Sequence, residues 1–303
     1  MHPKRLLALA VVVLALAAPA AATADDPPFV GWTALLPGLS LPYDPASPDD
    51  CTAGRSRCVD KTIREMTRRF DSLAASCDHK AIFSLTYLRV TQAYRQTIDG
   101  PFFDDTSFVN YEDTVFAHYY FSAFDDWKGG QIEDVPPAWR IAFDAAARHK
   151  VSATGDLLLG VNAHVQRDLP FVLYAIGGLA RPDGSSRKPD FDRVDVILNH
   201  VMQPLIAEIT RRFDPTTDDT ELPGSLDDAA LFQLLAAWRE DAWRSAEALA
   251  DAQTPAARDL VAAQIENTAA AEARTIVAST AYPPLSNGSA ARDAYCAVHH
   301  DDP

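Results

Sequence analysis

Apolar residues recur at helical spacing along most of this chain, from Val59 to Val277. Side chains three and four residues apart share one face of an α-helix, so the pattern predicts helices that bury one face in a common core. No Asn-Gly or Asp-Gly turn joins two segments of alternating residues, as a β-hairpin would require. We therefore expect an all-α single domain of about eight helices. The helices are expected after residue 57, after Asp78, over 104–128, from Pro136, and over 153–178, 191–213, 226–251 and 255–280.

Local signals predict where several helices begin and end. Thr254-Pro255 and Ser225-Leu226-Asp227-Asp228 resemble helix starts, and Gly129-Gly130 resembles a helix end. Residues 25–50 are rich in Pro, Asp and Ser, and they predict an extended arm over 25–56. The stretch after Pro283 is expected to be an irregular tail of the helical domain, which would span residues 57–303.

The first 24 residues have the pattern of a secretory signal peptide. Lys4 and Arg5 precede the short apolar run from Leu6 to Ala18, and small residues follow at Ala22-Thr23-Ala24. The run is too short to span a membrane, and no later run is long and apolar enough to do so. We expect a secreted, extracellular protein that begins near Asp25.

All four cysteines lie after this segment, and an even number suits an oxidising compartment. Three pairings can be formed. The short loop around Gly54 favours Cys51–Cys58, which leaves Cys77–Cys296 to tie the C-terminal tail to the body. The cysteines lack the paired C-x-x-C spacing of zinc clusters.

The chain is strongly acidic. Its formal charge is −15, and removal of residues 1–24 leaves 25 basic and 42 acidic residues, a charge of −17. Such a field repels nucleic acid, and no basic stripe with interleaved aromatic residues offsets it. Nucleic-acid binding is therefore not expected.

One segment, residues 155–170, carries a polar track through an apolar helical run. His164 and Asp168 stand four residues apart, so on a helix they share one face and can bind a metal together or act as a proton-transfer pair. Asp156 borders the same face two turns earlier. Asn162 and Arg167 are candidate substrate-binding residues, although a solvated arginine is the alternative for Arg167. A buried His–Asp pair can also be purely structural.

Other helices could complete a metal site around this pair. His118 lies in the aromatic-rich segment and is the candidate third ligand of a divalent metal such as zinc, although the pattern favours a core residue there. The cofactor stays open, as does the oligomeric state. No Gly-x-Ser-x-Gly, Gly-rich phosphate loop or His-Glu-x-x-His motif occurs.

The run from Gly160 to Pro170 resembles a family of secreted bacterial proteins catalogued only as a domain of unknown function. The resemblance extends over nearly the whole chain after the signal peptide and implies a single helical domain. It brings no activity and no catalytic residues. It includes Ile63-Arg64-Glu65-Met66, Phe83-Ser84-Leu85-Thr86-Tyr87-Leu88, Val135-Pro136-Pro137-Ala138-Trp139 and Leu231-Phe232-Gln233-Leu234-Leu235.

The His-x-x-x-Asp spacing of His164 and Asp168 is also distantly similar to zinc-dependent phospholipases C and single-strand nucleases, which are secreted helical enzymes. That group needs a second His with a carboxylate four residues later, but Pro204 stands at that offset from His200. Its N-terminal Trp ligand is also absent from a chain that begins near Asp25.

Two functions remain open on the sequence. In the first, the protein is a hydrolase in which His164 is a metal ligand or general base, with Asp168 and Asp156 as its acidic partners. In the second, it is a non-enzymatic protein that binds a small-molecule or lipid-like apolar ligand, and the His164–Asp168 pair is structural. In this second function, the residues predicted to line the ligand pocket are Phe108, Phe116, Tyr120 and Phe124.

Overall fold

A computed structural model describes residues 42–217, 228–283 and 286–303 of the chain. Within these ranges the fold is all-helical, as predicted, and the two β-bridges are isolated pairs. Taking α5, η3 and α6 as one continuous run, the described residues form nine helices, against the eight expected. In chain order the elements are α1 (Ser56–Ala74), α2 (Ala81–Thr97), α3 (Thr106–Gly129), η2 (Ile132–Asp134), α4 (Pro137–Ala147), α5 (Ala153–Val161), η3 (Asn162–Asp168), α6 (Leu169–Ala175), α7 (Lys188–Arg212), α8 (Asp228–Asp251), α9 (Pro255–Thr280) and α10 (Ala290–His299).

Several helix ends follow from local chemistry. The Thr254 side chain accepts a hydrogen bond of 3.1 Å from the N–H of Ala257, which confirms the predicted start of α9. Gly130 ends α3 with φ of 78°, a left-handed conformation that glycine adopts without strain. The predicted start signal at Ser225 to Asp227 lies outside the described residues, as does the signal peptide.

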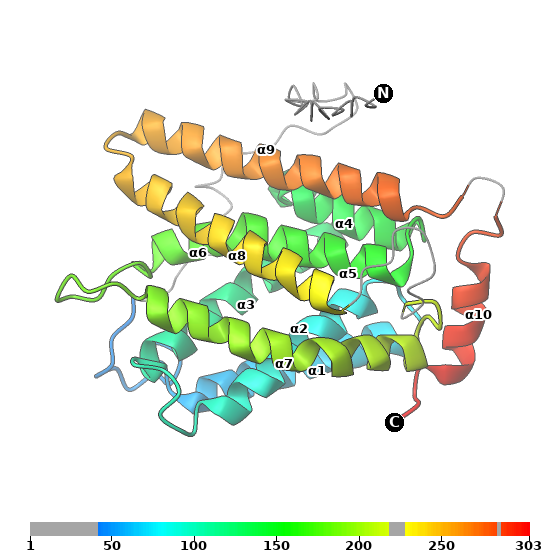
Figure 1. Cartoon of the computed structure of the whole chain (residues 1–303), viewed down its shortest axis with the longest axis horizontal. Coiled ribbons are helices and arrows are strands. Elements are labelled where there is room, and N and C mark those ends of the chain that lie inside the picture. Colours follow the sequence, from blue (N-terminus) through cyan, green and yellow to red (C-terminus); the bar gives the residue numbers. More distant parts are fainter. Residues whose placement is uncertain (1–41, 218–227, 284–285) are drawn as a thin grey trace, which may run out of the picture.

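The continuous run α5–η3–α6 lies at the centre of one helical domain. It contacts α2, α4, α8 and α9, and Figure 1 shows the long helices α7, α8 and α9 around it. Its apolar residues are buried almost completely, among them Leu157, Leu159 and Phe171. A polar residue in this run is therefore removed from bulk water and must find its partners inside the protein.

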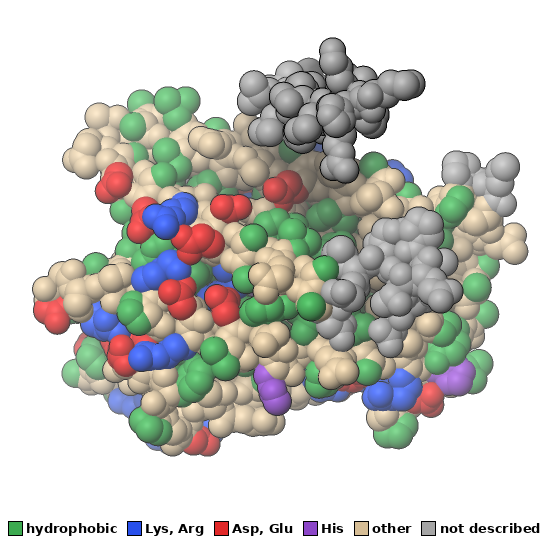
Figure 2. Space-filling model, in the orientation of Figure 1, with side chains coloured by type: hydrophobic (Ala, Val, Ile, Leu, Met, Phe, Trp, Pro, Cys, Tyr) green, Lys and Arg blue, Asp and Glu red, His purple; other side chains and the backbone are tan. Residues whose placement is uncertain are grey.

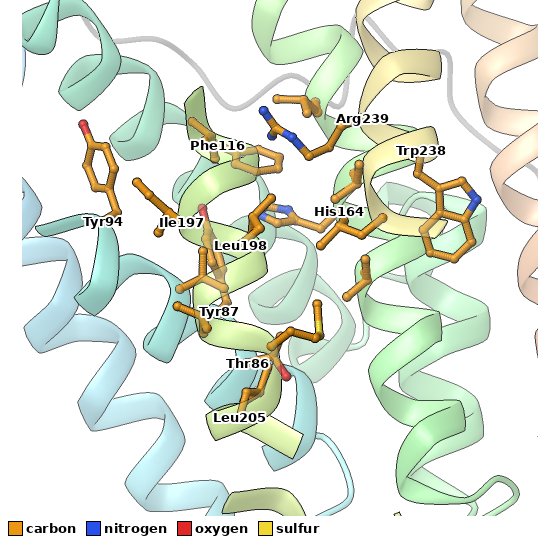
Figure 3. A pocket seen from close by; sticks show the side chains of 18 of the residues that line it. Thr86, Tyr87, Tyr94, Phe116, His164, Ile197, Leu198, Leu205, Trp238 and Arg239 are labelled. Atoms are coloured by element: carbon orange, nitrogen blue, oxygen red, sulfur yellow. The ribbon is translucent and has the colours of Figure 1, made fainter. Parts of the chain in front are cut away.

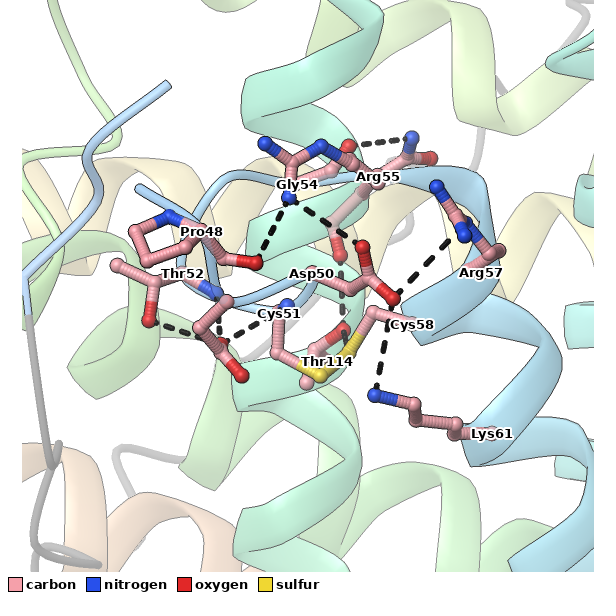
Figure 4. The surroundings of a disulfide bond; sticks show 12 residues. Pro48, Asp50, Cys51, Thr52, Gly54, Arg55, Arg57, Cys58, Lys61 and Thr114 are labelled. Carbon is pink, nitrogen blue, oxygen red and sulfur yellow. Dashed lines mark hydrogen bonds and ion pairs between the residues drawn. A yellow bond between two sulfur atoms is a disulfide. The ribbon is translucent and has the colours of Figure 1, made fainter. Parts of the chain in front are cut away.

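The described part of the N-terminal arm, residues 42–55, is a folded loop of turns closed by the Cys51–Cys58 disulfide (Figure 4). Gly54 has φ of 62°, and a Cβ there would lie 1.7 Å from the carbonyl oxygen of Ser107. Glycine is thus required where the loop approaches α3. Thr114 of α3 also donates a hydrogen bond of 3.3 Å to the Cys58 sulfur.

The C-terminal region corrects one prediction. Residues 290–299 form the helix α10, where an irregular tail was expected. The second predicted disulfide, Cys77–Cys296, joins α10 to the segment before α2. Arg292 of α10 also donates a hydrogen bond of 2.7 Å to buried Asp156 of α5. Figure 1 shows α10 at one end of the bundle.

Acidic and basic side chains are intermixed on the surface over α7 and α8. In Figure 2 they lie side by side on this face, and Lys188 pairs with Asp192 and with Glu240 there. No helix within the described ranges has the length and apolar character needed to cross a membrane.

Candidate functional site

The central helical run changes its winding at the predicted site. Residues 162–168 form a π-helix, and the run continues as α6 through Pro170. Pro170 lacks an N–H and its ring crowds the preceding turn, so a wider turn before it lets the helix continue. Gly160 stands just before the π-helix because a Cβ there would lie 2.3 Å from the Phe83 ring. π-Helical turns of this kind frequently mark functional positions.

The structure brings His164 and Asp168 together as predicted. The Nδ1 atom of His164 lies 3.1 Å from Oδ2 of Asp168, and both residues are buried, with exposed fractions of 3% and 0%. Trp139 donates to the same oxygen at 2.8 Å, and Arg167 donates to Oδ1 at 3.0 Å. Three donors thus surround one carboxylate. Because Asp168 only accepts, the proton of the neutral imidazole is on Nδ1, and Nε2 keeps its lone pair.

Burial keeps the His164 ring neutral. It lowers the pKa of His164, against the opposing effect of Asp168. The Phe116 ring stacks on the imidazole at 3.5 Å between centroids with an interplanar angle of 6°, and the Tyr87 ring lies at 4.4 Å. No described residue forms a hydrogen bond with Nε2 of His164. An unpaired buried acceptor is costly, so this atom is a candidate for contact with a ligand.

His164 lines a cavity of about 130 Å³ between α2, α3, the central run, α7 and α8 (Figure 3). The walls are mostly aliphatic and aromatic. Of the four aromatic residues predicted to line a ligand pocket, Phe116 lines this cavity, whereas Phe108, Tyr120 and Phe124 pack elsewhere in the core. Apolar lining residues include Phe83, Val109, Leu157, Val165, Leu169, Ile197, Leu198, Val201, Met202, Leu205, Leu235 and Trp238.

A few polar residues interrupt these apolar walls. The hydroxyl of Tyr87 and Oδ2 of Asp113 are buried and, like Nε2 of His164, have no hydrogen-bond partner among the described residues. Glu112 also lines the cavity. Burial raises the pKa of Glu112 to about 7, against the effect of Arg239, and raises the pKa of Asp113 to about 7. Titratable groups with such shifts are typical of functional sites.

The other predicted residues of the central run have partners away from the cavity. Arg167 is 1% exposed and lies between Asp168 and Glu266, so its charge is already balanced. The amide nitrogen of Asn162 donates to the carbonyl of Ala269 at 2.9 Å, while its Oδ1 has no partner among the described residues. Substrate binding by Asn162 and Arg167 stays a prediction, and the ion pairs of Arg167 do not favour it.

Asp156 and His118 lie apart from the His164–Asp168 pair. Asp156 accepts the hydrogen bond from Arg292, and burial raises its pKa to about 7. His118 is exposed on α3, since residues two positions apart on a helix point in nearly opposite directions and Phe116 packs on His164. The structure therefore does not assemble His164, Asp168 and His118 into one ligand set.

The structure shows a second cluster that the sequence did not indicate. Asp293 of α10 lies 2.8 Å from Nε2 of His79 and 3.1 Å from Nδ1 of His149. Among the described residues this is the one group of three His, Cys, Asp or Glu whose ligand atoms lie within 4.8 Å of one another. The Cys77–Cys296 disulfide could have pointed to it, because His79 and Asp293 flank those cysteines.

The hydrogen bonds of this cluster favour a structural role. Arg292 donates to Nδ1 of His79 at 3.1 Å, which places the imidazole proton on Nε2, toward Asp293. A metal at Nε2 would require the proton on Nδ1, where it would meet the guanidinium. Burial and the nearby Arg292 lower the pKa of His79 to about 4, so the ring is neutral near pH 7.

A family model described as a family of unknown function (DUF5995) matches residues 59–279. No curated protein and no solved structure matches the chain. The likeness of the His164–Asp168 spacing to zinc-dependent phospholipases C and nucleases therefore gains no support from either comparison.

Proposed function

We propose that this chain, which belongs to the family of unknown function DUF5995, binds a small ligand with an apolar body and one polar group in its central cavity. One observation carries the proposal. Three residues of a mostly apolar wall, Tyr87, Asp113 and His164, hold buried polar atoms with no partner among the described residues. A bound polar group would pair with such atoms, and the apolar walls would cover the rest of the ligand.

The size of the cavity limits the ligand. An apolar cavity of roughly 150 Å³ binds benzene in another protein, so about 130 Å³ suits one aromatic ring or a short aliphatic chain. A longer ligand would have to extend beyond the cavity.

A cavity-filling substitution tests the proposal. Val201 of α7 lines the cavity, so Val201→Phe should fill it and abolish the binding of benzyl alcohol in isothermal titration calorimetry. Val196→Phe is the matched control, because Val196 belongs to the same helix and is 61% exposed. Equal binding by both variants would contradict the proposal.

Hydrolysis is the second candidate function, and one observation favours it. Asp168 orients His164 so that Nε2 keeps its lone pair, which is the arrangement of a general base. The test is hydrolysis of a small aryl ester, such as phenyl acetate, by the wild type and by His164→Gln. If His164 is the base, the variant should lose at least about a hundredfold in rate. Equal rates would remove the support for this function.

We also propose that the protein is exported after cleavage near Asp25. Two disulfides within the described residues agree with an oxidising compartment. N-terminal sequencing of the protein recovered from the culture medium should give a sequence that starts near Asp25. Recovery of a reduced protein in the cell extract alone would contradict export.

A further inference from the structure

We infer that the polar group of the ligand is an amine in its ammonium form, attached to an aromatic or short aliphatic body. This inference rests on the proposed binding function and specifies its ligand class. It follows from the hydrogen-bonding character of the groups around the cavity, from their charges and from the aromatic walls.

The first support is the state of His164. Its Nδ1 atom donates to Asp168, so its free Nε2 atom accepts. An acceptor can be satisfied only by a ligand that carries an N–H or O–H. A carboxylate, ether or ketone oxygen would place two lone pairs against each other.

The second support is the charge around the cavity. Glu112 and Asp113 both line it. Arg239 and Arg187 act on Glu112 only at a distance, and Oδ2 of Asp113 has no hydrogen-bond partner among the described residues. Glu112 lies four residues and Asp113 three residues before Phe116. The three side chains therefore share the face of α3 that meets His164. A buried carboxyl group without a cation is costly, and an ammonium ion in the ligand would supply that cation.

The third support is that the cavity offers no cation for an anionic ligand. Arg239 is the one basic side chain among the described residues that line it. Its charge is already balanced, since it donates to Asp195 at 2.6 Å and to the carbonyl of Phe191 at 2.6 Å. A ligand carboxylate would therefore meet Glu112 and Asp113 without a free partner.

The aromatic walls add a further attraction for a cation. Phe116 and Tyr87 cover the His164 ring, and Trp238 lines the cavity on the side of α8 (Figure 3). The faces of such rings attract an ammonium ion, most strongly where water is excluded. The same rings enclose the apolar body of the ligand.

Three probes with one phenyl ring and different polar groups test the inference. Benzylamine, benzyl alcohol and benzoate are titrated calorimetrically into the mature full chain with its disulfides intact, at about pH 8, where carboxyl groups with a pKa of about 7 are ionised. We expect benzylamine to bind at least about tenfold more tightly than benzyl alcohol, because hydrogen bonds to charged groups are the stronger ones. Benzoate should bind at least about tenfold more weakly than the alcohol on the same grounds.

Asp113→Asn and Glu112→Gln then locate the effect while keeping the shape of the side chains. Asp113→Asn should weaken benzylamine binding at least about tenfold and weaken benzyl alcohol binding by a clearly smaller factor, because the variant loses a charge but keeps one acceptor oxygen. Glu112→Gln should also weaken benzylamine binding selectively. Asp301→Asn is the control, because this side chain is 89% exposed. Thermal melting verifies that each variant is folded.

The outcomes separate the inference from the proposal on which it rests. If benzyl alcohol binds and benzylamine binds no better, the amine inference is overturned while the cavity remains a binding site. If neither variant reduces the affinity for benzylamine, the inference is overturned as well. If none of the three probes binds, the proposed binding function fails and the inference fails with it.

Discussion

Arg292 of the C-terminal helix α10 donates a hydrogen bond of 2.7 Å to Asp156 of the central helix α5, and both side chains are buried. Arg292 also donates to Nδ1 of His79, and His79 in turn contacts Asp293. Two consecutive residues of α10 thus reach into the body of the protein. The sequence indicated only the Cys77–Cys296 disulfide as an anchor of the C-terminal region. The structure adds the buried contacts of Arg292 and Asp293.

Loss of this buried arginine should destabilise the protein strongly. Arg292→Leu leaves Asp156 buried without its cation, which costs about 3–5 kcal/mol in unfolding free energy. The loss should be smaller at about pH 5, because burial raises the pKa of Asp156 to about 7 and the carboxyl group is then neutral. Urea unfolding at neutral pH and at about pH 5 measures the loss of unfolding free energy under each condition. Arg64→Leu, which changes an exposed arginine, is the control and should have little effect; equal losses in the two variants would refute the prediction.

The two disulfides should contribute unequally to stability. The Cys77–Cys296 bond closes a loop of 219 residues and the Cys51–Cys58 bond closes a loop of 7. In the chain-entropy model the long closure contributes roughly 5 kcal/mol and the short one about 2 kcal/mol. Urea unfolding of the paired Cys→Ser variants compares them. A larger loss from removal of the short bond would show that loop entropy does not dominate.

Helices with strong local signals could be predicted from the sequence. The α9 range was predicted as 255–280, because a capping threonine, a first-turn proline and an apolar pattern coincide there. The helix α10 was missed because its burial depends on distant partners. Arg292 reaches Asp156, which lies 136 residues earlier, and no local pattern shows such a contact.

The same distinction holds for the candidate site. His164 and Asp168 could be paired from their spacing, since four residues on a helix bring side chains together. The roles of Glu112 and Asp113 could not be read in this way. They depend on a cavity that forms where five separate stretches of the chain come together, and on the engagement of Arg239 with Asp195 rather than with either carboxyl group.

The partners of the His164–Asp168 pair predict an asymmetry between two substitutions. Asp168→Asn removes one of the two carboxylates that pair with buried Arg167, and it turns an amide N–H toward donors, so it should cost about 3–5 kcal/mol. His164→Asn removes one hydrogen bond, while Trp139 and Arg167 still donate to Asp168, so it should cost about 1–3 kcal/mol. Urea unfolding at one pH measures both. A costlier His164 variant would show that the imidazole has a structural role beyond these contacts.

The raised pKa of Asp113 predicts how stability depends on pH. Burial raises this pKa to about 7 in the folded protein, whereas the group ionises near 3.8 when unfolded. The folded state therefore binds more protons between these values, and the contribution of Asp113 to stability falls as pH rises from about 4 to about 7.

Asp113→Asn removes this loss of stability at high pH. The variant should exceed the wild type in unfolding free energy by at least about 1 kcal/mol at pH values above 7 and match it below about pH 4. Asp301→Asn, whose side chain is 89% exposed, should show no such difference. A constant offset between Asp113→Asn and the wild type across this pH range would mean that folding leaves the pKa of Asp113 unchanged.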